Sequence, residues 1–381
     1  MKKLIFGICA AAAIFMVGCS KDASTDEVPA SNAINFSTYL GRDVQKRSSI
    51  LDNTSLTNFG VFASYTKDEP WDESEDGFNF MFDQKVTKTS GSWDYTPKKY
   101  WPTKKGEKIS FWAYAPYASE NAISVNSTKN SIGLPVIKYT ISDITKAEDF
   151  VAATLMNQVR TAPATDPDAS TCTVKFALKH ELTRVNIQAK LDETVDDKTK
   201  VNITSIEFNG GGVAKEALYM FPSTSGDRGA WVPFPHNPDG DTIVVDPLMK
   251  KNAVDLGGYI TPGVRLAGDI EEPVFNTNEF LFLIPPGGVS GITTEYNKIK
   301  IRVTYDIVTV DSALAAGHSV STAVKEIELP TGSLKQGTAY LYTLTFYMNE
   351  IVLSAEVDEN GWKEENEEGV EDDVDWNDVD K

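Results

Sequence analysis

The sequence predicts an all-β protein built from antiparallel β-sandwiches. Short runs of alternating apolar and polar residues recur along the chain, a pattern typical of half-buried strands. Clusters of asparagine, serine, glycine and proline separate these runs. No long stretch repeats its apolar residues at the 3.6-residue period of a helix, so the runs favour antiparallel sheets over a parallel sheet with crossover helices.

Length and composition are those of a globular protein with two cores. The chain has 381 residues, 41% of them hydrophobic and 24% charged, and two domains are the expectation for that length. The formal net charge of −19 argues against nucleic acid as a partner and against electrostatic docking on anionic lipid.

The first nineteen residues predict an export signal. Lys2 and Lys3 precede an uncharged apolar run over residues 4–17, which is too short to span a membrane. Val17-Gly18-Cys19 resembles the lipobox of bacterial lipoproteins. That resemblance implies a signal peptide over 1–18, a lipid on Cys19 and a polar tether over 19–33. An ordinary secretory signal or a membrane-anchored N-terminus is the alternative.

The first strand is predicted over residues 34–40, with Ile34, Phe36 and either Tyr39 or Leu40 on its apolar face. The basic, polar stretch 41–49 after it predicts an exposed loop. Further strands are expected over 59–65, 78–86, 109–115 and 149–153. A polar stretch with two prolines, 157–171, predicts the end of an N-terminal sandwich spanning 34–171.

A C-terminal sandwich is predicted over residues 172–362. Its expected strands are 173–178, 185–191, 201–208, 280–284, 298–310, 339–347 and 351–357. The proline- and glycine-rich stretch 213–275 is expected to form long loops. The acidic tail, 363–381, has ten Asp or Glu among the seventeen residues from Glu364 to Asp380 and predicts a solvated segment.

Cysteine usage predicts cores held by packing alone. Cys9 would leave with the signal and Cys19 would carry lipid, so only Cys172 remains and no internal disulfide is expected.

Catalytic motifs are missing from the sequence, so we expect no enzyme and no cofactor. The three histidines, His180, His236 and His318, stand in unrelated contexts, and neither Gly-x-Ser-x-Gly nor His-Glu-x-x-His occurs.

One acidic stretch weakly resembles a calcium-binding loop. Asp72, Ser74, Asp76 and Asp83 occupy positions 1, 3, 5 and 12 of an EF-hand-like pattern, with Gly77 at position 6. The flanking helices are absent from the predicted structure, so an acidic hairpin loop is favoured and no metal is predicted.

Tryptophans keep a second function open, a surface glycan-binding lipoprotein or adhesin that does not polymerise. Trp71 and Trp231, in predicted loops, are the side chains that would stack on sugars. Trp101 and Trp112 are expected to be buried.

An ordered set of segments resembles the fimbrillin-like family, the Mfa-like and FimA-like subunits of type V pili. The segments are Phe59-Gly60-Val61-Phe62-Ala63, Tyr100-Trp101-Pro102, Gly106 to Tyr117, Asp149 to Ala153, Phe176 to Val185, Phe282 to Gly287 and Gly337 to Leu344. The resemblance implies two transthyretin-like sandwich domains in tandem. It also implies a lipid anchor at the outer membrane, a place at the cell surface and other pilus subunits as partners, with adhesion to host or bacterial surface ligands as the purpose.

The resemblance further implies assembly by strand exchange. In polymerising members an arginine-specific protease cuts in the loop after the first strand, and Arg42 and Arg47 are the arginines there. The strand with Ile34 and Phe36 would leave, and a strand of another subunit would fill its groove.

A candidate for the donated strand carries apolar residues at every second position, namely Ile351, Leu353, Ala355 and Val357. The alternative is that both strands simply complete their own sandwiches. The acidic tail departs from the family pattern, so stalk, tip and anchor roles all stay open.

Overall fold

The computed structural model confirms the all-β fold class. It describes residues 32–40, 51–118, 122–141, 148–160, 172–233, 240–245, 262–275, 280–286, 298–330 and 334–357. The elements in these ranges are all strands. Their bounds are β1 (Asn35–Leu40), β2 (Asn58–Lys67), β3 (Met81–Thr89), β4 (Ser92–Asp94), β5 (Lys108–Ala115), β6 (Ile123–Val125), β7 (Val136–Thr140), β8 (Val151–Gln158), β9 (Thr173–His180), β10 (Thr183–Leu191), β11 (Thr199–Asn209), β12 (Glu216–Met220), β13 (Ala230–Pro233), β14 (Ile243–Val244), β15 (Val264–Leu266), β16 (Glu272–Pro273), β17 (Leu281–Leu283), β18 (Lys300–Val310), β19 (His318–Glu328), β20 (Ala339–Phe346) and β21 (Ile351–Val357).

Seven strands form a sheet that curls around its own core. The strand order is β1-β9-β8-β5-β2-β3-β4, and the two outer strands, β1 and β4, contact each other. Alternate residues of β2 and β5, such as Val61 and Phe111, point into the enclosed core. The residues between them, such as Phe62 and Trp112, belong to a second core on the opposite face. Both faces are therefore buried, which explains the near-continuous apolar runs of these strands.

A four-stranded sheet, β13-β12-β7-β6, covers that opposite face. The layers meet through aromatic side chains. The ring of Phe150 lies 6.1 Å from that of Tyr139 and 5.0 Å from that of Tyr219, centroid to centroid. Such packing makes the curled sheet and the four-stranded sheet one sandwich.

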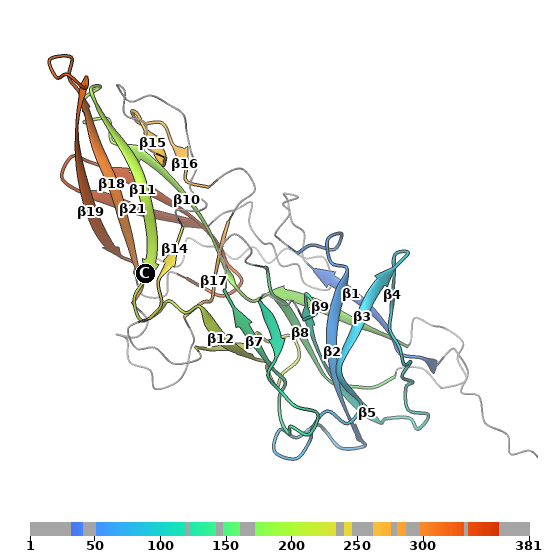
Figure 1. Ribbon diagram of the computed structural model, residues 1–381. Coiled ribbons are helices and arrows are strands. Elements are labelled where there is room, and N and C mark those ends of the chain that lie inside the picture. The colour runs from blue at the N-terminus through green and yellow to red at the C-terminus, as the bar shows by residue number, and fades with distance from the viewer. Residues whose placement is uncertain are drawn as a thin grey trace, which may run out of the picture.

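Two further sheets form the other end of an elongated molecule (Figure 1). One has the order β16-β10-β20-β21 with β17 also paired to β10, and the other β14-β11-β18-β19 with β15 also paired to β11. Most pairs are antiparallel, but β10 runs parallel to β20 and β1 parallel to β9. Both sheets contribute to the same core, through residues such as Ile187, Tyr342, Ile203 and Val303.

The sheets do not divide the chain at the predicted boundary between 171 and 172. β9, from beyond that position, pairs with β1 and β8, and β12 pairs with β7. The tandem two-domain arrangement therefore stays a prediction.

The stretch 213–275 was expected to form long loops, and this expectation is corrected, because the stretch contains the short strands β12 to β16. The cause is that these strands are only two to five residues long, too short to show a long apolar run in the sequence.

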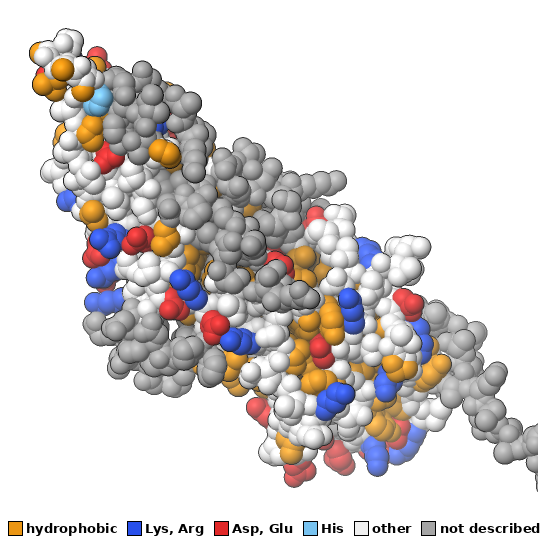
Figure 2. Space-filling model, viewed as in Figure 1, with side chains coloured by type: hydrophobic (Ala, Val, Ile, Leu, Met, Phe, Trp, Pro, Cys, Tyr) orange, Lys and Arg blue, Asp and Glu red, His pale blue; other side chains and the backbone are white. Residues whose placement is uncertain are grey.

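Charge is distributed unevenly over the molecule. The curled sheet, taken as β1, β2, β8, β9 and residues 81–115, contains ten lysines and three acidic residues, although the whole chain carries −19. Figure 2 shows Lys side chains over the part of the molecule that carries β2, β3 and β4. Acidic side chains near this sheet concentrate in the connection 68–76, which packs through Trp71 against Trp112 in the second core.

Candidate functional site

The first strand closes the curled sheet. On one side, residues Asn35 to Leu40 pair in parallel with Thr173 to Leu178. On the other side, the Ile34 amide donates to the carbonyl of Lys99 at 2.8 Å, and residues 33 and 100 form a bridge. β1 thus lies between β9 and the segment after β4, as Figure 1 shows for β1 and β9. Removing it would leave unpaired backbone groups on both sides.

Phe36 fills an aromatic pocket inside this closure. Its ring centroid lies 5.8 Å from that of Phe176, 6.0 Å from Phe59, 5.2 Å from Tyr95 and 6.3 Å from Phe111. Ile34 and Leu40 are fully buried in the same core. β1 therefore supplies three of the apolar side chains that hold the curled sheet together.

Side-chain amides hold the two ends of the strand. At its start, the side-chain nitrogen of Asn32 donates to the backbone carbonyl of Trp101 at 2.8 Å. The side-chain oxygen of Asn32 accepts a hydrogen bond from the guanidinium of Arg160. At its end, Asn53 accepts from the Leu40 amide at 2.8 Å and donates to the Leu40 carbonyl at 2.5 Å. These contacts fix the register of the strand on β9.

A buried contact between a histidine and an aspartate holds the chain at Leu51. His180 Nδ1 lies 2.8 Å from Asp149 Oδ2, and both side chains are buried. The same carboxylate oxygen accepts the Leu51 amide at 3.1 Å. Leu51 is thus held by a residue outside β1.

Tyr95 ties the strand to the far side of the pocket. Its hydroxyl donates to the Ile34 carbonyl at 2.9 Å. Burial raises the pKa of Tyr95 to about 12, although the backbone of Lys99 opposes the shift. An unfolded tyrosine ionises near its ordinary value of about 10. The stabilisation is therefore complete below pH 10 and is lost as the pH rises towards 12.

We expect Tyr95→Phe to reduce the loss of stability at alkaline pH, because phenylalanine has no hydroxyl that can ionise. At neutral pH the variant should be less stable by about 1 kcal/mol, the usual net value of one hydrogen bond. The free energy of unfolding should then fall less steeply between pH 10 and 12 than in the unchanged protein. Urea denaturation at several pH values measures both effects, and parallel curves for the two proteins would contradict this account of Tyr95.

The candidate donor strand, β21, lies at the edge of its sheet. Among the described strands it pairs only with β20, from Ile351 opposite Phe346 to Val357 opposite Tyr340. Ile351, Leu353 and Val357 pack against the core and are half-buried. Ala355 shares this face by the two-residue period of the strand and is exposed, so three of the four predicted residues are half-buried.

The structure does not assemble the calcium-loop candidates. The carboxylate of Asp72 accepts a hydrogen bond from the Ser74 hydroxyl at 2.6 Å. The carboxylate of Asp83 instead accepts from the hydroxyls of Tyr114 at 2.7 Å and Tyr117 at 3.3 Å. Burial raises the pKa of the Asp83 carboxyl, and the two tyrosines oppose that shift. Within the described ranges, no cluster of His, Cys, Asp and Glu side chains could hold a metal ion.

Neither tryptophan required for glycan stacking is exposed. Trp71 is 9% exposed and packs its ring 5.2 Å from Trp112, while Trp231 is 2% exposed and lies in β13. Trp101 and Trp112 are buried as expected. The glycan-binding alternative therefore loses the residues on which it depended, because loops between packed sheets bury their large rings.

Other predicted site residues lie outside the described residues. They are Cys19, Arg42 and Arg47, together with the signal segment and the tail. Within the part of the chain that the structure describes, no helix is both long and apolar enough to cross a membrane.

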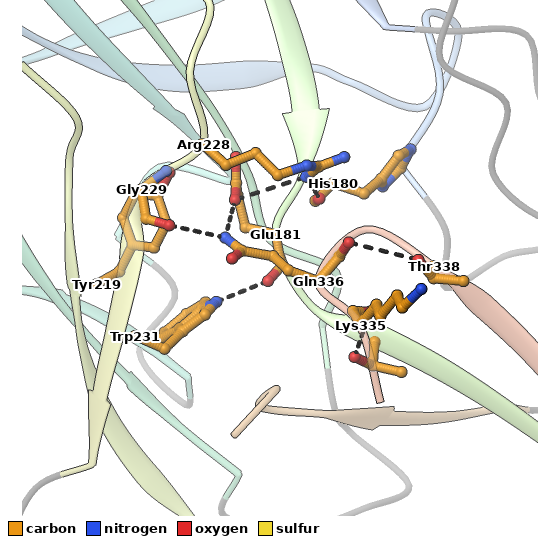
Figure 3. A network of polar contacts seen from close by, with 10 residues as sticks. His180, Glu181, Tyr219, Arg228, Gly229, Trp231, Lys335, Gln336 and Thr338 are labelled. Carbon is orange, nitrogen blue, oxygen red and sulfur yellow. Dashed lines mark hydrogen bonds and ion pairs between the residues drawn. The ribbon is translucent and has the colours of Figure 1, made fainter. Parts of the chain in front are cut away.

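A polar network that sequence reasoning missed joins the two ends of the molecule (Figure 3). Glu181 lies directly after β9 and is 1% exposed. Its side-chain carboxylate accepts a hydrogen bond from Gln336 Nε2, and its backbone carbonyl accepts one from Trp231 Nε1 at 2.6 Å. Arg228 NH1 lies 3.7 Å from the same carboxylate. Gly337, at φ +67°, packs against the Arg228 guanidinium, so a larger residue there would be strained and crowded.

The fold and site define an all-β structural protein whose first strand closes a sheet and whose last described strand lies at an edge. The chain belongs to the fimbrillin-like family, whose model matches residues 47–362. This is a family of structural fimbrial subunits, not known for enzymes. Membership makes the chain a cell-surface component that interacts with other parts of a pilus.

Two relatives agree with this assignment. The chain is 28% identical over 379 residues to the fimbrium subunit Fim1C of Phocaeicola vulgatus, covering 94% of this chain and 96% of the relative. It is also similar to the crystal structure of a fimbrial protein from Bacteroides vulgatus, with 27% identity and a TM-score of 0.69. That match covers 87% of this chain and 99% of the other.

Proposed function

We propose that this protein is a pilus subunit that joins its neighbours by strand exchange and serves adhesion. Cleavage after Arg42 or Arg47 would separate β1 from the rest of the chain, leaving it held only by non-covalent contacts. Its departure opens the pocket of Phe36 and the backbone edge of β9. An extended strand from another subunit would restore both the hydrogen bonds and the buried side chains. A lipid on Cys19 would attach the uncut protein to the outer membrane.

The observation that carries this proposal is a match between the buried positions of two strands. In β1 and the residue before it, the buried residues are Ile34, Phe36 and Leu40. In β21 the core-facing residues are Ile351, Leu353 and Val357. Both sets have the same spacing, two residues and then four. The intervening inward positions hold Thr38 and Ala355, which are small.

The spacing is asymmetric, so it matches only when the two strands run in the same direction. Aligning Ile351 with Ile34 puts Leu353 in the pocket of Phe36 and Val357 at the place of Leu40. β21 of one copy would therefore lie parallel to β9 of the next, as β1 does.

The native cysteine provides a test of this register. Cys172 is buried and lies one position before Thr173, which pairs with Asn35. A donated strand would place residue 351 beside it. After cleavage, Cys172 is the only cysteine left in the chain.

The experiment uses the Ile351→Cys protein, cut with an arginine-specific protease and oxidised. We expect loss of a fragment ending at Arg42 or Arg47 by mass spectrometry, and disulfide-linked ladders on a non-reducing gel. Leu353→Cys, cut in the same way, is the matched control and should give few links because it lies beside Val174. Cut protein that stays monomeric, with or without the new cysteine, would contradict strand exchange.

A further inference from the structure

Lysine side chains border the strand that the proposed exchange would replace. Lys175 lies in β9 opposite Ser37, on the outer face, and is exposed. Lys179 is four residues further along β9, directly after Leu178, which pairs with Leu40. β1 itself carries no charged residue. β1 therefore brings no charge of its own to this edge.

A third lysine marks the end of β1. Lys88 Nζ donates at 2.9 Å to the carbonyl of Asn53, the residue whose side-chain amide holds the Leu40 backbone. At the start of β1, Lys98 pairs with Asp94 at 2.6 Å and the guanidinium of Arg160 binds the side chain of Asn32. Positive side chains thus accompany the whole length of the strand.

The candidate donor strand carries the opposite charge at the matching end. In the parallel register, Ser354 aligns with Ser37 and Glu356 with Tyr39. Glu356 would therefore lie diagonally between Lys175 and Lys179 of the neighbouring copy, on the outer face, within reach of both long side chains. Glu356 is exposed in β21. The sequence then continues with Asp358 and Glu359, and ten more acidic residues follow from Glu364 to Asp380.

We propose that the lysines along β9 and at the end of β1 recognise the acidic end of β21, and the acidic segment that follows it, in a second copy of this chain. This inference rests on the proposed strand exchange and adds what selects the donor. The attraction accelerates encounter between subunits that each carry a large negative charge.

A charge-swap series tests the proposal with the full-length protein, cut by an arginine-specific protease. Assembly is followed by the rate at which ladders resistant to SDS form at about 20 mM and about 500 mM salt, conditions chosen to span weak and strong screening. For the unchanged protein we expect assembly to be about tenfold slower at the higher salt concentration.

Lys175→Glu and Glu356→Lys should each slow assembly about tenfold at low salt, and the protein carrying both changes should recover most of the rate. Lys85→Glu is the matched control. Lys85 is an exposed lysine of β3 whose amine lies over the Tyr117 ring, and β3 does not pair with β1 or β9, so its reversal should leave the rate unchanged.

The outcomes separate the two proposals. Ladders that form at equal rates in all variants and at both salt concentrations would overturn the recognition by lysines and leave strand exchange standing. Absence of ladders from the unchanged, cut protein would overturn strand exchange and this inference with it. Slowing by both single reversals without recovery in the double variant would also contradict the pairing of Lys175 with Glu356.

Discussion

Replacing Phe36 by alanine should destabilise the curled sheet by about 3–5 kcal/mol, the usual loss for a buried phenylalanine. The side chain packs against four aromatic rings, so the cavity left behind cannot close without moving several strands. After cleavage beyond β1 the same change should have a second effect. The trimmed strand should leave faster, because it has lost its largest buried side chain.

Urea denaturation measures the first effect, and mass spectrometry of the released fragment over time measures the second. Ser37→Ala is the matched control, because Ser37 lies on the outer face of the same strand beside Lys175, where substitutions usually change stability by less than about 0.5 kcal/mol. Equal stability of the two variants would mean that Phe36 does not anchor β1.

Replacing Glu181 by alanine should cost about 2–3 kcal/mol and loosen the connection between the two ends of the molecule. The change removes the carboxylate that accepts from Gln336 and lies near Arg228, and losing a buried charge partner is costly. Gln336 keeps the Gly229 carbonyl as an acceptor and Arg228 keeps the His180 carbonyl. Arg228 is partly exposed, so water offsets some of the loss.

Hydrogen exchange would show where the loosening occurs. The Gly337 amide donates to the Leu182 carbonyl at 2.9 Å and the Arg184 amide to the Thr338 carbonyl at 3.0 Å, so these two amides should exchange faster. Amides of β2 and β5, in the curled sheet, are the internal control. Faster exchange spread evenly over both regions would contradict a local role for Glu181.

The local pattern of the sequence predicted many of the strands but not how they meet. Val185 to Leu191 alternates apolar and polar residues, and β10 follows that stretch closely because one face of it is buried. β19 went unpredicted because almost all of its side chains are exposed, and its conformation comes from pairing with β18 rather than from alternation. Trp71 was placed in an exposed loop because a sequence does not show which distant sheet will cover a ring.

The candidate site was predictable only in part for the same reason. The apolar residues of β1 could be identified from alternation, and they are buried. The parallel pairing with β9, the pocket around Phe36 and the Glu181 network depend on residues far apart in the chain. Ala355 shows the limit of alternation, because the pattern gives the face of a residue but not whether another layer covers it.

The parallel pairing of β1 with β9 has a consequence for how the chain acquires its structure. β1 emerges early during synthesis, but the strand beside it is made more than a hundred residues later, and the four-stranded sheet still awaits β12 and β13. Contacts between such distant segments are slow to form. The apolar face of β1 therefore lacks part of its cover until β9 has been made, and a chain ending at residue 171 would leave Phe36 without β9. Folding of the first half thus depends on completion of part of the second, and chaperone protection during this interval would limit the aggregation of unpaired strands.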